Sequence, residues 1–333
     1  MTGREKLKTE RLSLRPLAGS DETAWVAALN DFAVLKWLSA PPFPYTPEDF
    51  RDFLAQYQPG TRWVIEDAQG LCGGISLTPH LGYWVGRRAQ GHGYATEASR
   101  AVLGAHYAAP QAGGLRSGYF EGNAASAAVL TKLGFTETGR HPEWCQPRGC
   151  DLPHVDMALT RMAYAEANPF TLQTPRLTLD PVTSADATAI RRIVTDPRVG
   201  SMLFVFSPNL SDAEARDFAH RWRWTGTPPF RLALRLNRDF IGTIGLKGLD
   251  DPEIYYFLAP EHQRRGYLSE VLPAFLAAIR ERFALPLVTA KAFIDNPASI
   301  RLLESNGFRP GGLDSVNSSA RPGPAPVRIF HLP

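Results

Sequence analysis

The chain has 333 residues, enough for about two domains that each bury a core of their own. Hydrophobic residues make up 44% and charged residues 21%, which is ordinary for a globular protein and argues against disorder. The formal net charge of +3 is small and the basic residues form no stripe, so no nucleic-acid partner is expected. The longest uncharged apolar run, Val271 to Ile279, is too short to cross a bilayer, so no membrane partner is expected either.

Cysteine usage points to a reducing compartment. Cys72, Cys145 and Cys150 are too few for a disulfide framework, and no histidine accompanies them at zinc spacing. We expect three free thiols and no metal site. The amino terminus, Met1 to Lys8, is polar and has no apolar core. A cytoplasmic location is therefore expected.

The first half of the chain predicts short strands and helices in alternation. A half-buried strand is expected from Thr9 to Pro16, and a helix from Asp21 to Asn30. After an aromatic, proline-rich passage, Thr46 can cap a second helix with Pro47 in its first turn. An antiparallel meander then follows, with strands expected at Trp63–Ile65, Gly73–Leu77 and His80–Val85.

A glycine-punctuated turn leads from the last of these strands into an amphipathic helix. Its sequence is Gln90-Gly91-His92-Gly93-Tyr94-Ala95-Thr96-Glu97. Two glycines just before a helix let the backbone N–H groups converge on one spot, and the helix N-terminus adds partial positive charge there. The pattern predicts a cradle for an anion, best suited to phosphate or pyrophosphate.

The remainder of the first half predicts a strand, a helix and a final strand. The strand is expected at Leu115–Phe120, and the helix from Asn123, which can cap it, to Leu133 before a Gly-Phe pair. The last strand is expected at Val155–Leu159. Residues 165–174 are expected to be a linker.

The second half repeats the first. Gln263-Arg264-Arg265-Gly266-Tyr267-Leu268-Ser269-Glu270 matches the turn at an offset of 173 residues, and the same offset relates Asn123 and Ser126 to Asn296 and Ser299. Such a constant offset marks a duplication. The corresponding strands are expected at Phe230–Leu236, Ile241–Leu246, Glu253–Leu258, Leu287–Ile294 and Val327–Leu332, the helix at Asn296–Ser305, and a loop at Gly311–Pro326.

The strand order, the glycine turn and the Asn-x-x-Ser…Gly-Phe segment together resemble the GNAT superfamily of acyl-CoA-dependent N-acetyltransferases. Residues 93–98 and the opening Thr-x-Arg-Leu-x-Leu look most like its ribosomal-protein-alanine acetyltransferase (Rim-type) branch. The resemblance covers both halves. It implies an α/β (α+β) fold of two tandem domains, 1–168 and 169–333, each a mixed, mostly antiparallel sheet flanked by helices. We expect the two to pack as an internal pseudo-dimer.

By this resemblance the cofactor is acetyl-CoA. Loop amides would hold its pyrophosphate, and the fourth and fifth strands of each domain would splay to admit the pantetheine arm beside Asn123 and Ser126. The cofactor-binding residues implied in the first copy are Trp84, Val85, Gln90, Gly91, His92, Gly93, Tyr94, Ala95, Thr96, Asn123 and Ser126. Those implied in the second are Leu258, Gln263, Arg264, Arg265, Gly266, Tyr267, Asn296 and Ser299.

The second copy departs from the family pattern. Leu268 stands where Gly or Ala is expected, and Pro273 falls inside the following helix, where it should produce a kink. Arg264 and Arg265 instead give the second loop more positive charge. Neither copy has the tyrosine that many relatives use as general acid, since Leu130 and Leu303 occupy that place. The leaving thiolate would take its proton from Ser126 or Ser299, another group, or water.

An alkylammonium is almost wholly protonated at neutral pH, so acetyl transfer to an amine needs a general base. At the position where relatives often place a carboxylate stand His80 and Glu253, which we take as the candidate bases. A polar residue is also common at the start of a strand, so neither His80 nor Glu253 needs a catalytic role to explain its presence there. For Glu97 and Glu270 a structural or dipole-balancing role is favoured. A backbone N–H near Val85 or Leu258 would stabilise the oxyanion.

The predicted function is acetyl-CoA-dependent N-acetyl transfer to a primary amine by direct attack in a ternary complex, with the first copy active. The acceptor could be a protein N-terminus, an antibiotic or a small metabolite. The alternative is a catalytically silent acyl-CoA-binding or interaction protein that retains the fold, which the missing tyrosine and the irregular second loop favour.

Overall fold

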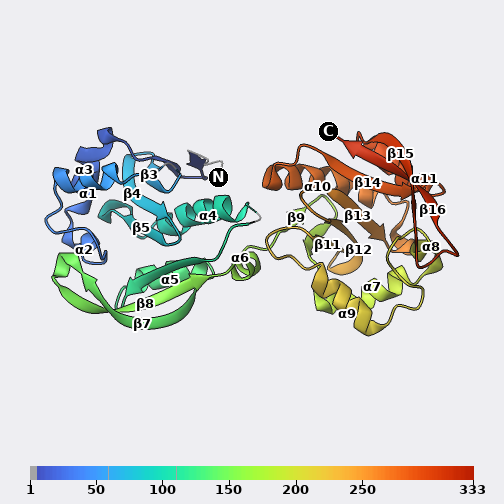
Figure 1. The fold of residues 1–333 in the computed structure, drawn as a ribbon, viewed down its shortest axis with the longest axis horizontal. Coiled ribbons are helices and arrows are strands. Elements are labelled where there is room, and N and C mark those ends of the chain that lie inside the picture. The colour runs from blue at the N-terminus through green and yellow to red at the C-terminus, as the bar shows by residue number, and fades with distance from the viewer. Residues whose placement is uncertain (1–5, 59, 110) are drawn as a thin grey trace. The chain divides into compact units, whose positions relative to one another are not determined.

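The computed structural model describes residues 6–58, 60–109 and 111–333. The chain forms two compact units, Met1–Ala167 and Asn168–Pro333. In Figure 1 the first runs from blue to green and the second from green to red. Both are α+β and their sheets are mostly antiparallel, as predicted. None of the helices in the described part of the chain is long and apolar enough to span a membrane.

Unit 1 contains eight strands. They are β1 (Leu7–Lys8), β2 (Ser13–Pro16), β3 (Arg62–Asp67), β4 (Gly70–Leu77), β5 (Leu81–Val85), β6 (Leu115–Phe120), β7 (Thr136–Cys145) and β8 (Cys150–Leu159). Its α-helices are α1 (Glu22–Leu29), α2 (Phe32–Leu35), α3 (Pro47–Ala55), α4 (Tyr94–Tyr107), α5 (Ala124–Lys132) and α6 (Arg161–Ala167).

The strands of unit 1 form two sheets, one ordered β1-β2-β3-β4-β5 and the other β6-β8-β7. Consecutive strands β5 and β6 therefore belong to different sheets. Among the described residues they are joined by one isolated parallel bridge, between His80 and Arg116. Beyond that bridge the two strands do not pair, so they diverge, as the family resemblance implied.

Unit 2 repeats this plan with one continuous sheet, ordered β15-β16-β14-β13-β12-β11-β10-β9. Its strands are β9 (Leu172–Gln173), β10 (Thr178–Pro181), β11 (Phe230–Leu236), β12 (Asp239–Leu246), β13 (Glu253–Leu258), β14 (Val288–Phe293), β15 (Arg309–Val316) and β16 (Ala325–Leu332). Its α-helices are α7 (Ala187–Val194), α8 (Pro197–Gly200), α9 (Asp212–Arg221), α10 (Tyr267–Phe283) and α11 (Pro297–Ser305).

The divergence of β5 and β6 has its counterpart in unit 2. Strands β13 and β14 pair in parallel at Glu253↔Thr289 and Ile254↔Ala290, and the pairing stops there. Since Glu253 and Thr289 follow His80 and Arg116 at the repeat offset, the one bridge in unit 1 and the first pair in unit 2 are the same contact. Both units thus splay at the same point.

Helix α4 packs against the core of unit 1 through the face that its sequence period predicted. Ala98, Val102, Leu103 and Tyr107 are buried on this helix. The Tyr107 hydroxyl donates to the Leu159 carbonyl oxygen at 2.8 Å, which ties the end of α4 to β8. The helix is therefore held at its C-terminal end by the core, and this leaves its N-terminal amides at the glycine turn.

The strand predicted from Thr9 to Pro16 begins only at Ser13. Residues before it form a tight turn in which the Thr9 N–H donates to the Leu12 carbonyl oxygen at 2.9 Å. The turn is stabilised by Glu97, whose carboxylate accepts hydrogen bonds from Thr9 and Arg11. Alternation of apolar residues could not reveal this contact, because Glu97 lies far along the chain.

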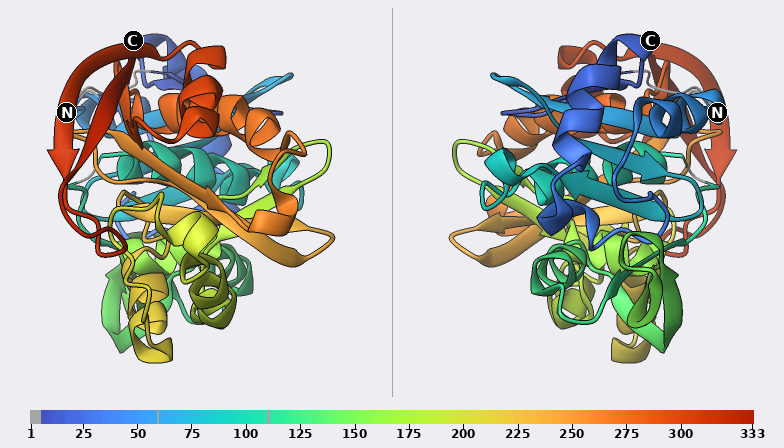
Figure 2. Two further views of the ribbon diagram at one scale, coloured as in Figure 1. Left: turned by 90° about the vertical axis from the view of Figure 1, so that its right-hand side faces the viewer. Right: turned by 90° about the vertical axis from the view of Figure 1, so that its left-hand side faces the viewer.

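Three further predictions about segments were wrong. Strand β7 and the first half of β8 were not predicted, because their exposed polar residues hide the alternation. Of the loop expected at 311–326, residues 311–316 belong to strand β15, whose register shifts between Pro310 and Leu313, and residues 325–326 begin β16. The β15–β16 hairpin is the long red ribbon of Figure 2. The linker expected from residue 165 is still helical in α6 up to Ala167.

Pro273 does not interrupt the second helix. Helix α10 runs unbroken from Tyr267 to Phe283 with Pro273 inside it. The flanking Val271, Leu272 and Phe275 are fully buried, so tertiary packing holds the helix where one backbone hydrogen bond is lost. The three cysteines, Cys72, Cys145 and Cys150, are free, as predicted.

Candidate active site

A cavity of about 480 Å³ occupies the gap between β5 and β6 in unit 1. Its wall brings together the glycine turn, strand β5, the start of helix α5 and the inner face of β8. Of the cofactor-binding residues implied for this unit, those in the wall are Trp84, Val85, Gln90, Gly91, Gly93, Tyr94, Ala95, Thr96, Asn123 and Ser126. His80 also lines it. Residues from distant parts of the chain thus line one open cavity.

The glycine turn presents unpaired amides to this cavity. Gly91 and Gly93 both have φ of 78°, a left-handed conformation that glycine adopts without strain. Gly93 is the N-cap of α4, and among the described residues no side chain caps this helix end. The first N–H groups of α4 are therefore left for a ligand, and the helix dipole favours an anionic one. The geometry fits a pyrophosphate.

Gln90 shapes the turn through its side chain. Its Nε2 donates to the Val85 carbonyl oxygen at 3.0 Å, and Gln263 makes the same bond to Leu258 at 3.1 Å in unit 2. The glutamine of each repeat therefore fastens the turn to the end of the diverging strand. This bond holds the turn beside the strand, and the assignment of Gln90 and Gln263 to the cofactor stays a prediction.

Glu97 has the structural role that was favoured for it. It pairs with Arg11, whose Nη2 lies 2.5 Å from Oε2, and accepts from the Thr9 hydroxyl at 2.5 Å. Burial opposes ionisation of Glu97, but the hydrogen bonds from Thr9 and Arg11 outweigh it and hold the pKa of this carboxyl below its usual value. The Arg11 guanidinium also stacks over the Tyr94 ring, 5.1 Å from its centroid. Unit 2 repeats the arrangement with Thr174, Arg176, Tyr267 and Glu270.

His92 lies outside the cavity wall. Its Nδ1 is 2.9 Å from the Gln90 carbonyl oxygen, and its ring is tilted against Tyr94 with centroids 5.5 Å apart. These contacts are made within the turn itself. His92 therefore supports the conformation of the turn from the side away from the cavity.

A pair of hydroxyl groups lies at the centre of the cavity wall. Asn123 caps α5 by accepting from the Ser126 N–H at 3.2 Å, and this places the Ser126 hydroxyl 2.9 Å from the Tyr83 hydroxyl. Unit 2 has the same pair, Tyr256 and Ser299, at 2.7 Å. The tyrosine was missed in the sequence, although Tyr83 and Tyr256 obey the repeat offset and could have been found by it. Burial raises the pKa of Tyr83 to about 12, so its hydroxyl keeps its proton.

His80 stands at the mouth of the cavity, directly before β5. Burial of the ring against its neighbours lowers the pKa of His80, although the residue keeps an exposed surface. The nearby His154 also lowers this pKa, whereas the carboxylates of Glu143 and Asp156 raise it. A lowered pKa leaves the imidazole neutral at pH 7. Glu143 and His154 are themselves wall residues that the sequence did not single out, because they lie on the unpredicted parts of β7 and β8.

Backbone N–H groups of β5 point into the gap. The Gly86 N–H donates to the Cys72 carbonyl oxygen, and alternate residues of a strand turn their N–H groups to opposite edges. The Val85 N–H therefore faces away from β4, toward the cavity. In unit 2 the Ala259 N–H donates to Ile241, which turns the Leu258 N–H the same way.

Unit 2 differs at the matched positions. Arg264 takes the place of Gly91 and is held at φ 60°, in the region that non-glycine residues avoid. Glu253, the counterpart of His80, is only 4% exposed, and its carboxylate lies 3.7 Å from the Lys247 ammonium. Leu268 is half-buried at the start of α10. The arginine therefore adds charge at the cost of backbone strain, and the candidate base is held in an ion pair.

We expect Arg264→Gly to stabilise unit 2 by about 1 kcal/mol, because a left-handed non-glycine residue costs roughly that much. The change should appear in thermal or urea unfolding of the full chain as a shift of the transition that belongs to unit 2. Arg265→Gly, at an adjacent position without positive φ, is the control and should be neutral or destabilising. Equal effects of the two changes would contradict the strain.

Known proteins resemble both halves of this chain in sequence. The model of the acetyltransferase (GNAT) domain matches residues 11–136 and again residues 176–309. The N-acetyltransferase YoaA of Bacillus subtilis is 30% identical over 151 residues, which cover 43% of this chain and 84% of YoaA. The B. subtilis protein YkkB is 27% identical, over 44% of this chain and 94% of its own.

Solved structures are similar in fold to half of the chain. A GNAT acetyltransferase from Bacillus anthracis matches 49% of this chain and 98% of its own, with 18% identity and a TM-score of 0.42. RimL, a ribosomal L7/L12 alpha-N-protein acetyltransferase in complex with coenzyme A, matches 49% and 97%, with 16% identity and a TM-score of 0.42. The two family matches confirm the family and the duplication inferred from the sequence, and the chain belongs to the GNAT family of N-acetyltransferases.

Proposed function

We propose that unit 1 transfers an acetyl group from acetyl-CoA to a primary amine by direct attack in a ternary complex. One observation carries the proposal: a single cavity connects the unpaired amides of the glycine turn, the Tyr83–Ser126 hydroxyl pair and His80. A cofactor bound by its phosphates at one end would thus extend past the hydroxyl pair toward a candidate base at the other.

The cofactor would supply an acetyl group activated as a thioester. The amides from Gly93 to Thr96 would hold the pyrophosphate at the N-terminus of α4, where no described side chain competes for them. The diverging edge of β5 would accept the pantetheine arm beside Asn123 and Ser126. These residues fit the cofactor because the turn has no side chain at either glycine and the gap is already open in unit 1.

His80 would act as the general base. The acceptor amine must lose a proton to attack, and a neutral imidazole at the cavity mouth can take it directly or through one water. The lowered pKa of His80 keeps it in the neutral form at pH 7. The Val85 N–H, which faces the gap, would stabilise the negative charge that develops on the acetyl oxygen.

The Tyr83–Ser126 pair would serve the leaving sulfur. With a pKa near 12, Tyr83 is too weak an acid to protonate a thiolate fully, but it can donate a charge-assisted hydrogen bond. Its place beside Ser126 would orient one of the two hydroxyls toward the sulfur. The pair thereby supplies a donor in a chain that lacks the tyrosine that many relatives use.

We expect Tyr83→Phe to lower kcat roughly 10-fold to 100-fold, the worth of one hydrogen bond to a charged group. The KM for acetyl-CoA should change much less, because the sulfur carries charge only as it leaves. Tyr256→Phe removes the matched hydroxyl in unit 2 and should leave turnover unaltered. If the two variants behave alike, the pair has no part in the reaction.

Unit 2 supports a second candidate role, binding without turnover. Its counterpart of the base is buried and ion-paired with Lys247, and its loop is strained at Arg264. We propose that it retains the fold and contributes no chemistry. The alternative for the whole chain is an acyl-CoA-binding or interaction protein that keeps the fold and catalyses no reaction.

A panel of primary amines tests the proposal. Peptides with free N-termini, aminoglycosides and small metabolic amines should be incubated with acetyl-CoA, and free thiol release measured against time. At least one class should give turnover above the rate without acceptor. The absence of release with every amine, in protein shown by calorimetry to bind coenzyme A, would favour the silent alternative.

A further inference from the structure

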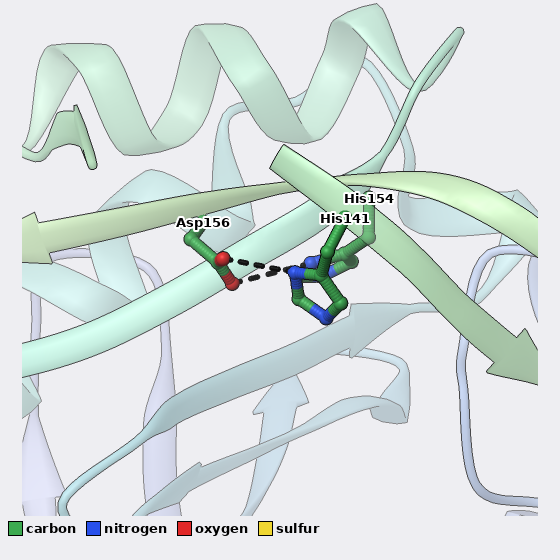
Figure 3. Close-up of side chains that lie close together, drawn as sticks. All are labelled: His141, His154 and Asp156. Carbon is green, nitrogen blue, oxygen red and sulfur yellow. Dashed lines mark hydrogen bonds and ion pairs between the residues drawn. The ribbon is translucent and has the colours of Figure 1, made fainter. Parts of the chain in front are cut away.

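Two histidines and two carboxylates share one face of the β7–β8 hairpin. His141 and His154 are direct cross-strand partners, and Glu143 and Asp156 each lie two residues beyond one of them. Since side chains alternate between the faces of a strand, all four project from the same side. Figure 3 shows the His141 and His154 rings converging on Asp156.

The polar atoms of this cluster approach one another closely. Nδ1 of His141 is 3.0 Å from Asp156 Oδ2, and Nδ1 of His154 is 3.4 Å from Asp156 Oδ1. Glu143 Oε2 is 3.3 Å from Nδ1 of His154 and 3.7 Å from Nε2 of His141. In a tetrahedral zinc site with bonds of about 2.0–2.2 Å, neighbouring ligand atoms are separated by roughly 3.4 Å. The separations of the two histidine Nδ1 atoms from Asp156, 3.0 and 3.4 Å, are close to that value, and one ligand atom from each of His141, His154 and Asp156 lies within 4.8 Å of the others.

The His154 side chain is buried in the cavity wall with one ring nitrogen left without a hydrogen bond to the described residues. It is 8% exposed, and its Nδ1 is buried without a hydrogen bond to any described residue. Its ring lies over Gly118 of β6, where a Cβ atom would come within 2.2 Å of Cε1. The ring also packs edge-on against Phe120 of the same strand, with centroids 5.4 Å apart. The ring is therefore fixed with an unsatisfied nitrogen aimed at two carboxylates.

The matched face of unit 2 is occupied differently. At the positions of Gly118 and His141 stand Lys291 and Asp314, whose ammonium and carboxylate form an ion pair at 2.9 Å. At the position of His154 stands Val327, which is buried. In unit 2 the Asp314 carboxylate is thus neutralised by the Lys291 ammonium. In unit 1 no lysine stands at that position, and the groups beside the Asp156 carboxylate are the imidazoles of His141 and His154.

We propose that His141, His154 and Asp156 form a binding site for a divalent transition metal such as Zn²⁺, with a water molecule as the fourth ligand. Imidazole nitrogen and carboxylate oxygen are ligands that this class of metal accepts, and a cation would satisfy the buried nitrogen of His154. This departs from the expectation of no metal, which rested on cysteine spacing alone. The cluster escapes a sequence search because its two halves come from two strands.

A metal here would join the two strands of the hairpin and hold the His154 ring in the cavity wall, next to the mouth where His80 stands. The site needs no acetyl-CoA, and its existence can be tested without any measurement of turnover.

The test is equilibrium dialysis of tag-free, EDTA-treated full-length protein against Zn²⁺, with bound metal measured by mass spectrometry. One Zn²⁺ per chain is expected at micromolar free metal. His141→Gln should raise the Kd more than about 100-fold, beyond the effect typical of an outer-shell partner. His141 is exposed, so this change should leave the fold intact, and Asp156→Asn provides a second variant. Substitution by Co²⁺ should give the visible absorption of a four-coordinate ion.

Two matched changes serve as controls. His106→Gln alters a histidine on α4, and Asp314→Asn alters the counterpart of His141 in unit 2; both should bind Zn²⁺ as the wild type does. Failure of the wild-type protein to bind, or equal losses in His141→Gln and His106→Gln, would overturn the proposal. Two Zn²⁺ per chain with unchanged binding in Asp156→Asn would also overturn it.

Discussion

Replacing His80 with alanine is expected to lower kcat roughly 100-fold or more, the usual effect of losing a general base. The ring lies at the mouth of the cavity in unit 1, and burial keeps it neutral at pH 7. Without it the acceptor amine must be deprotonated by water. The KM for acetyl-CoA should change little, because His80 directly precedes β5, whereas the glycine turn follows the other end of that strand. Steady-state kinetics with the best acceptor of the amine panel measures both values.

The pH profile gives the same prediction a second readout. A base must be unprotonated, so activity should rise with pH as the His80 proton is lost. Since the pKa of His80 is lowered, the midpoint of the rise in activity should lie at a pH below the ordinary histidine pKa of about 6.5. In His80→Ala this limb should be absent, and the remaining activity should increase with the fraction of free amine.

Glu253→Ala is the matched control, because Glu253 occupies the corresponding position in unit 2. It should leave turnover unchanged at every pH. If Glu253→Ala instead abolishes activity while His80→Ala is silent, the reaction takes place in unit 2 and our assignment of the active unit is wrong.

Gly93→Asp is expected to raise the Kd for coenzyme A roughly 100-fold or more. A Cβ at this position would meet no close neighbour, since the nearest atom within reach is Arg11 Nη2 at 3.8 Å. The effect therefore comes from charge and backbone conformation. A carboxylate a few ångströms from a phosphate costs on the order of a few kcal/mol at a partly exposed site, and each 1.4 kcal/mol is about tenfold in affinity.

Gly93→Asn separates the two contributions. Asparagine has nearly the same shape and tolerates the left-handed conformation about as well, but it carries no charge. We expect it to weaken binding less than about tenfold. Gly266→Asp, at the matched N-cap of α10, should leave the affinity of unit 1 intact. Isothermal titration calorimetry on the full chain distinguishes these variants, and undiminished affinity in Gly93→Asp would remove the turn from the binding site.

The repeat and the glycine turn could be read from the sequence because their signals are local. Positive φ at Gly91 and Gly93 follows from residue type, and the buried face of α4 follows from helical period. Matched positions such as Asn123 and Asn296 cap their helices in the same way. Short-range preferences of this kind survive in the folded chain wherever the core does not oppose them.

Where sequence reasoning failed, a long-range contact had overruled a local preference. Thr9 turns away from its strand because Glu97 binds it. Arg264, for which the sequence predicted no backbone conformation, is held left-handed in the folded unit. Helix α10 continues through Pro273 among buried neighbours, and the kink expected there stays a prediction. In each case packing or hydrogen bonding from elsewhere offsets a cost of about 1–3 kcal/mol.

The sequence by itself determined the duplication, the family, the amide cradle at Gly93 and the candidate base at His80. Only the tertiary structure decided that Tyr83 lies against Ser126 and that His141 and His154 meet beside Asp156. The physical reason is that these contacts join strands far apart in the chain. No local pattern encodes them, because the register that brings such strands together is settled by the packing of the whole unit.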